Sequence, residues 1–182
     1  MAPRRELLLL RHGLAEEPQP EREDGQRRLT AEGAQRTSGV LQRLVQLDLV
    51  CDLVLSSPLV RARQTAELAL SAGLAAELEL AAPLAPLADP LPLLERWLGP
   101  LAPRPGWRRL ALVGHEPDLS TLAALLIGVP MTQAPEALQL KKAGVVLLQL
   151  PAVLPAAGLL GAARLSMLLP PRLFLGPRSL NA

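Results

Sequence analysis

The sequence predicts an α/β fold, a three-layer α/β/α sandwich around a largely parallel central sheet. Short apolar runs alternate along the chain with segments whose apolar residues recur every three or four positions. Strands that alternate with helices in this way are typical of a parallel sheet covered on both faces. Apolar residues make up 49% of the 182-residue chain, which is enough for a buried core. Because neither an internal repeat nor a break in composition is visible, we expect one domain over residues 1–182.

A polar loop separates the first strand from the first helix. Glu6–Leu10 contains four consecutive leucines and predicts a short buried strand. Leu14–Arg28, with two prolines and many charges, predicts an exposed loop. Thr30 can cap the helix that follows, and Glu32 suits the positive end of its dipole. The apolar stripe of this helix is formed by Val40, Leu41, Leu44, Val45 and Leu47.

The next two strands flank a second helix. Leu53–Leu55 predicts a strand, and the turn Ser56–Pro58 leads from it into a helix. We expect that helix to run through about Leu70 and to end at Gly73. Glu77–Leu80 predicts a third strand at an edge of the sheet.

A proline-rich stretch leads to the fourth strand. Ala82–Pro92 is expected to be a loop, and it carries Asp89. A short helix over Leu93–Leu98 and a loop over Pro100–Gly106 follow. Arg109–Val113 is the next apolar run and predicts another buried strand.

The last part of the chain begins with a turn over Gly114–Pro117. A helix is expected from about Asp118 to Leu126, since Pro and Asp both suit a first helical turn. Gly144–Leu150 and Ala163–Leu168 predict two late strands that could form a hairpin with a long loop. Beyond Pro170 the sequence has no regular pattern; the apolar residues there that could pack on the body are Leu173, Phe174 and Leu175.

Composition excludes several classes of protein. A net charge of +2, with one Phe, two Trp and no Tyr, does not suggest a nucleic-acid-binding protein. The single cysteine, Cys51, excludes an internal disulfide and a multi-cysteine metal site, and we expect it to be a small buried side chain. No uninterrupted apolar run approaches the length of a membrane span. We therefore expect a soluble, cytoplasmic protein without a membrane partner.

Both histidines of the chain follow apolar runs that predict buried strands. Arg11 and His12 come directly after the four leucines, and His115 follows the later run Arg109–Val113. Ligands of open α/β sheets bind outside the carboxyl ends of the strands. The two imidazoles and the fixed charge of Arg11 are therefore expected at one ligand site, and Gly13 lets the chain turn sharply there.

A helix N-terminus adds to this site. The helix after Ser57–Pro58 offers unpaired backbone N–H groups, and Arg61 lies in its first turn. Cationic side chains and helix ends that converge at strand ends favour a phosphoryl group.

Four motifs together resemble the histidine phosphatase (phosphoglycerate mutase-like) superfamily, and in particular its small SixA-type phosphohistidine phosphatases. They occur in the family's order and carry Arg-His-Gly, Arg-x-Leu-Thr-x-x-Gly, Ser-Pro-x-x-Arg-Ala-x-Gln-Thr and Gly-His-x-Pro. In this chain they are Arg11–Ala15, Arg27–Gly33, Ser57–Thr65 and Gly114–Pro117.

The resemblance implies covalent catalysis by His12, which would attack phosphorus and become a phosphohistidine. It assigns the non-bridging phosphoryl oxygens to Arg11, Arg61 and His115. Gly13 and Arg27 complete the implied phosphate-binding set, and Arg28 competes with Arg27 for its role. The resemblance implies neither a metal nor another cofactor, and the sequence has no His/carboxylate cluster at ligand spacing.

The general acid is where the chain departs from larger relatives, which carry a Glu on a long insertion after the second helix. The stretch from Thr65 to Trp107 is too short for a large cap domain. Asp89 is the expected acid, and Glu16 and Glu116 are the alternatives. Loss of an imidazole from phosphorus needs less acid catalysis than loss of an alkoxide, since the nitrogen can be protonated by solvent.

The resemblance and the short chain favour a phosphatase that hydrolyses phosphohistidine on a phosphotransfer protein of a signalling or sugar-transport relay. The first alternative is a phosphomonoesterase acting on phosphorylated small molecules on the same scaffold. A non-catalytic phosphate- or partner-binding module is a further alternative, and a mutase is the least favoured.

Overall fold

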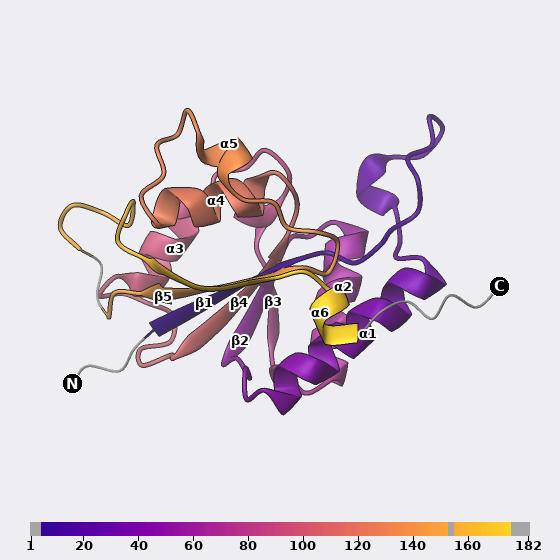
Figure 1. The fold of residues 1–182 in the computed structure, drawn as a ribbon, viewed down its shortest axis with the longest axis horizontal. Coiled ribbons are helices and arrows are strands. Elements are labelled where there is room, and N and C mark those ends of the chain that lie inside the picture. The colour runs from indigo at the N-terminus through magenta and orange to yellow at the C-terminus, as the bar shows by residue number, and fades with distance from the viewer. Residues whose placement is uncertain (1–4, 153–154, 176–182) are drawn as a thin grey trace.

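The computed structural model describes residues 5–152 and 155–175 and contains a six-stranded sheet (Figure 1). The strand order is β3-β2-β4-β1-β5-β6. The first four of these run parallel, whereas β5 and β6 pair antiparallel with their neighbours. The strands are β1 (Arg5–Arg11), β2 (Leu53–Ser56), β3 (Leu78–Leu80), β4 (Arg109–Gly114), β5 (Val145–Leu150) and β6 (Arg164–Leu169).

Helices cover both faces of the sheet, which confirms the predicted three-layer α/β/α sandwich. One face carries α1 (Ala31–Gln46), α2 (Val60–Ser71) and α6 (Arg172–Leu175). The other carries α3 (Leu91–Leu98), α4 (Asp118–Leu126) and α5 (Ala134–Ala137). Two short 3₁₀ turns, η1 (Asp24–Gln26) and η2 (Ala82–Leu84), lie in the loops. None of the helices in the described part of the chain is long and apolar enough to cross a membrane.

The four leucines of β1 supply both apolar layers. Leu7 and Leu9 pack into the layer under α3 and α4, and Leu8 and Leu10 pack against α1 and α2. All four are fully buried. A central strand in a sheet that is covered on both faces has no side exposed to solvent. Its sequence is therefore a continuous apolar run rather than an alternation of apolar and polar residues.

Strands β1 and β4 are adjacent, and the chain leaves them in opposite directions. After β1 it leads to α1 on one face, and after β4 to α4 on the other. Such a divergence opens a crevice at the carboxyl ends of the two strands, where α/β proteins bind ligands. Arg11 of β1 lies opposite Gly114 of β4, so His12 and His115 follow at the same height.

Several predicted elements differ in detail. Helix α3 begins at Leu91 rather than Leu93, because the Asp89 carboxylate accepts the backbone N–H of Leu91 at 2.9 Å and Pro92 fits the first turn. The tail after Pro170, expected to be irregular, forms the short helix α6. Phe174 and Leu175 pack on the α1 face as expected, but Leu173 is 65% exposed.

Two other expectations hold. The Thr30 side chain caps α1 by accepting the N–H of Gly33 at 2.9 Å. Cys51 is buried, and burial raises the pKa of its thiol to about 12, so it stays a neutral apolar side chain.

Candidate active site

The two histidines lie side by side at the carboxyl ends of β1 and β4. Their ring centroids are 5.1 Å apart, and the rings are tilted by 55°. The backbone N–H of His12 donates to Gly114 O at 3.1 Å, which ties the end of β1 to the end of β4. Both rings are buried. The strand register therefore brings together two imidazoles that are far apart in sequence.

The His12 ring is held with its Nε2 lone pair free of a proton. Its Nδ1 lies 2.7 Å from the carbonyl oxygen of Gly13, which can only accept, so Nδ1 carries the hydrogen. Burial lowers the pKa of His12 to about 3, and the charges of Arg61 and Arg11 act in the same direction. His12 is therefore neutral at pH 7, which is the form a nucleophile requires.

Gly13 is required by close packing. A Cβ at this position would lie 2.3 Å from Thr37 Oγ1 on α1. The backbone N–H of Gly13 also donates to Thr65 Oγ1 at 3.1 Å, and that hydroxyl donates to the carbonyl of Arg61 at 2.8 Å. Thr65 thus joins the turn after β1 to the first turns of α2, which places Arg61 next to His12.

Arg61 points from the first turn of α2 at the nucleophilic nitrogen. Its Nε–H donates to His12 Nε2 at 3.3 Å. Its two terminal nitrogens turn to Asp24 instead: Nη1 donates to the backbone carbonyl at 2.8 Å and Nη2 to the carboxylate at 2.9 Å. The guanidinium therefore spans from His12 to Asp24.

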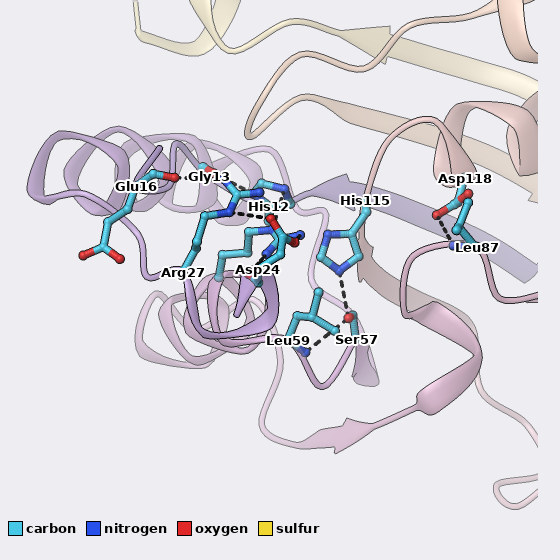
Figure 2. Close-up of polar contacts among 11 residues, drawn as sticks. His12, Gly13, Glu16, Asp24, Arg27, Ser57, Leu59, Leu87, His115 and Asp118 are labelled. Atoms are coloured by element: carbon cyan, nitrogen blue, oxygen red, sulfur yellow. Dashed lines mark hydrogen bonds and ion pairs between the residues drawn. The ribbon is translucent and has the colours of Figure 1, made fainter. Parts of the chain in front are cut away.

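Asp24 is a site residue that the sequence reasoning did not identify. Its carboxylate bridges Arg61 and Arg27, whose Nε–H donates to Oδ1 at 2.7 Å, and Figure 2 shows Asp24 and Arg27 beside His12. Partial burial opposes ionisation of this carboxyl, but the hydrogen bond from Arg27 and the charge of Arg61 prevail and lower its pKa. The one signal in the sequence is the three-residue spacing from Asp24 to Arg27.

Arg27 is the arginine that the structure places beside Arg61. Its Nη1 also donates to the carbonyl of Glu16 at 2.8 Å, so two contacts fix its side chain. Arg28 is exposed, and its backbone N–H donates to the Glu16 carboxylate at 3.0 Å.

His115 turns one ring nitrogen toward Ser57 and the other toward the side of His12 (Figure 2). Its Nε2 lies 2.8 Å from Ser57 Oγ, which also accepts the N–H of Leu59 at 3.3 Å. Its Nδ1 is buried and has no hydrogen-bond partner among the residues that the structure describes. Burial and then the charge of Arg61 lower the pKa of His115 to about 4. The site thus holds a neutral imidazole with an uncommitted nitrogen.

Arg11 lies at the same strand end but contacts a different segment. Its Nη1 donates to the carbonyl of Leu140 at 2.7 Å, while its Nε is buried without a partner in the described residues. Burial lowers the pKa of Arg11, and Glu116 opposes this by its negative charge. Arg11 is the cation on the β5 side of His12, as Arg61 is on the α2 side.

The three carboxylates considered as general acid each have a local partner. Asp89 is exposed and accepts the backbone N–H of Leu91, the first residue of α3. Glu16 pairs with Arg22 at 2.6 Å. Glu116 accepts the hydroxyl of Ser120 at 2.7 Å within the first turn of α4.

The loop of Asp89 is tied to the end of the sheet that holds His115. The N–H of Leu87 donates to the Asp118 carboxylate at 3.1 Å, at the start of the helix that follows His115. Figure 2 shows this contact on the far side of His115 from His12. Within residues 5–152 and 155–175, no three His, Cys, Asp or Glu side chains cluster so as to hold a metal ion.

Comparison with known proteins places the chain in a family. A model of the histidine phosphatase superfamily (branch 1) matches residues 7–84. An uncharacterised protein from Picosynechococcus is 43% identical over 144 residues, which are 78% of this chain and 82% of that protein.

Two solved structures share the fold. A protein histidine phosphatase SixA complexed with tungstate matches with a TM-score of 0.74 and 22% identity, over 91% of this chain and 97% of that one. A mycobacterial glucosyl-3-phosphoglycerate phosphatase matches with a TM-score of 0.72 and 17% identity, over 91% and 99%. The chain belongs to the histidine phosphatase superfamily, and its fold is that of the SixA phosphohistidine phosphatases.

Proposed function

We propose that this protein is a phosphohistidine phosphatase that hydrolyses the P–N bond on a phosphotransfer protein through a phosphoenzyme on His12. The observation that carries this proposal is the neutral His12 ring, whose proton is held on Nδ1 by Gly13 O and whose Nε2 faces Arg61. A buried, correctly protonated imidazole beside fixed cations is suited to in-line attack on a phosphoryl group.

The reaction takes two displacements. In the first, the Nε2 lone pair of His12 attacks phosphorus, the P–N bond of the substrate breaks, and the leaving imidazole takes up a proton. In the second, water attacks the phosphoenzyme, the P–Nε2 bond breaks, and inorganic phosphate leaves. The hydrogen bond from Nδ1 to Gly13 O stabilises the positive charge that the ring carries while it bears the phosphoryl group.

Arg61 can bind the phosphoryl group without releasing Asp24. A guanidinium has five N–H donors, and the contacts of Arg61 use one on each nitrogen. Two N–H donors lie on the guanidinium edge that faces His12: Nε–H and the second hydrogen of Nη2. In the complex, a phosphoryl oxygen replaces His12 Nε2 as the acceptor of Nε–H. In this proposal Asp24 anchors the opposite edge and is a positioning residue for Arg61 and Arg27.

His115 supplies a further donor. When the Ser57 hydroxyl donates to Nε2, the proton of the neutral imidazole resides on Nδ1, the buried nitrogen without a partner in the described residues. That N–H would donate a hydrogen bond to a non-bridging oxygen of the phosphoryl group. Arg11, Arg27 and Arg61 then supply the positive charge that a metal ion supplies in other phosphatases, and His115 adds a neutral N–H donor, so the proposed chemistry uses no metal.

We propose Asp89 as the general acid, because its loop is held beside the start of α4. A phosphohistidine substrate makes small demands on this group, since solvent can protonate the leaving imidazole. The segment between α2 and β4 contains β3, η2 and α3 but no large cap domain. The absence of a cap there is compatible with a protein substrate.

A second candidate is hydrolysis of small phosphomonoesters. The similarity of fold to the glucosyl-3-phosphoglycerate phosphatase favours it, since that protein is named for a small phosphorylated substrate. The two candidates share His12 and differ in the substrate alone.

The test compares purified protein on a phosphotransfer domain labelled with ³²P on histidine and on a panel of small phosphomonoesters. The proposal predicts a kcat/KM for the phosphoprotein that exceeds that of every ester in the panel. Turnover of an ester together with an inert phosphoprotein would replace it by the second candidate.

A further inference from the structure

A groove of about 680 Å³ opens beside Arg11, on the α1 and α6 side of the sheet. Its floor is apolar and includes Leu14, Leu140 and Leu168. Arg36 of α1, Lys141 and Lys142 before β5, and Arg172 of α6 line it together with Arg11, and Glu32 is the acidic residue in that lining. Four separate segments therefore contribute positive charge to one depression, which we call the basic groove.

The basic groove is built directly onto the candidate active site. The N–H of Ala143 donates to the carbonyls of both Arg11 and His12 at 3.1 Å, and Arg11 Nη1 donates to Leu140 O. The wall formed by residues 139–143 is thus fixed to the residue proposed as nucleophile and to its neighbour. Arg11 is the residue that the groove shares with the proposed phosphate-binding set, since His12, Arg61 and His115 do not line it.

Three of the positive charges in the groove are unpaired within the described residues. Arg36, Lys142 and Arg172 make no hydrogen bond or ion pair with other residues in the described part of the chain. Arg36 is half-buried, whereas Lys141, Lys142 and Arg172 are exposed. Protein interfaces have an apolar centre surrounded by a polar rim. The groove has the same arrangement, because side chains without an ion-pair partner in the described residues surround its apolar floor. Charge complementarity then calls for acidic side chains on the partner.

We propose that the basic groove docks an acidic surface of the phosphoprotein next to its phosphohistidine, so that it selects the protein substrate. This inference rests on the proposed function and names the partner surface that the site would recognise. An apolar side chain of the partner would lie on the leucine floor, and its carboxylates would meet Arg36, Lys142 and Arg172. The phosphoryl group itself would be bound by the separate set around His12.

Single charge reversals test the proposal. Arg36→Glu and Lys142→Glu alter two different walls of the groove, and Arg43→Glu is the matched control because it is exposed near the other end of α1. Each variant is assayed on a phosphotransfer domain labelled on histidine that has an acidic surface, and on p-nitrophenyl phosphate. We expect each groove variant to lower kcat/KM for the phosphoprotein by about fivefold, mainly through KM. Activity on the small ester, and both activities of Arg43→Glu, should stay within about twofold of wild type.

Salt provides a second readout. Because exposed charges are screened over about 10 Å at 0.1 M ionic strength, added salt should lower wild-type kcat/KM for the phosphoprotein more steeply than that of either groove variant. Unchanged phosphoprotein kinetics in both variants would overturn the docking proposal while leaving the proposed function intact. An equal loss on the small ester would also overturn it, since the groove would then not distinguish protein substrates. A wild-type protein that hydrolyses the ester but never the phosphoprotein would refute the proposed function, and the docking proposal with it.

Discussion

The Nε–H of Arg61 lies 3.3 Å from Nε2 of His12, so the guanidinium points at the lone pair that would attack phosphorus. The same side chain is anchored at its other end by Asp24, at 2.8 and 2.9 Å. This relay explains why residues from three segments, the end of β1, the turn η1 and the first turn of α2, have to meet for the site to form.

Asp24→Ala is expected to lower kcat/KM by about ten- to a hundredfold, because hydrogen bonds between charged groups contribute about 1.5–3 kcal/mol. Most of the loss should fall in KM, and Asp24→Asn, which keeps one acceptor oxygen, should lose less. The melting temperature should change little, because the carboxylate is 56% exposed. Glu23→Ala, an exposed carboxylate one residue away, is the control. Wild-type kinetics in Asp24→Ala would remove Asp24 from the site.

Gly13→Ala should destabilise the fold by about 1–3 kcal/mol, because the new Cβ meets Thr37 Oγ1 at 2.3 Å. The measurement is urea unfolding. Adding Thr37→Ala removes the clashing oxygen and should recover part of the loss in a double-mutant cycle. Gly25→Ala, whose Cβ would meet Leu59 Cγ at an ordinary 3.8 Å, is the matched control. A Gly13→Ala protein as stable as wild type would contradict this explanation of the glycine.

Acid should destabilise the protein through its two histidines. The unfolded chain protonates a histidine near pH 6.5, whereas the folded pKa values are lowered to about 3 for His12 and about 4 for His115. Between pH 6.5 and 4 the unfolded state binds more protons, so the free energy of unfolding falls as pH falls. The expected slope is up to about 1.4 kcal/mol per pH unit for each histidine. Urea titrations from pH 7 to pH 4.5 should show a shallower slope for His115→Asn, and an unchanged slope would contradict the lowered pKa.

Much of the candidate site could be predicted from the sequence because Arg11, His12 and His115 lie at the carboxyl ends of strands. The apolar runs before His12 and His115 define two parallel strands, and parallel strands end at one edge of a sheet. Asp24 could not be found in this way. Its contact with Arg61 joins residues 37 positions apart in the chain, and it depends on how an irregular loop closes.

Other details were undecidable for similar reasons. Arg27 and Arg28 are equivalent by composition, but the segment is extended, with Leu29 bridged to Ala15, and neighbouring residues of extended chain point to opposite sides. Only one of the two can therefore face the site. Helices α5 and α6 are four residues long, too short for an apolar stripe to reveal.

Asp89→Asn tests the acid and the substrate together. With phosphohistidine the change should matter little, because the leaving imidazole is protonated by solvent. With an alkyl phosphomonoester it should matter more, since a positioned acid contributes about 10²–10⁴-fold to the loss of an alkoxide. Comparing kcat/KM for both substrates decides the point. Equal losses would refute the leaving-group argument, and no loss on either would direct attention to Glu16 and Glu116.

The central claim is that His12 carries the phosphoryl group. The direct measurement is to mix the protein with a histidine-labelled ³²P-phosphoprotein, quench with base, in which phosphohistidine survives, and map the labelled residue by mass spectrometry. We expect label on His12 in the wild type, whereas a folded His12→Ala variant should show neither label nor turnover. Label on another residue, or turnover by His12→Ala near the wild-type rate, would contradict the account.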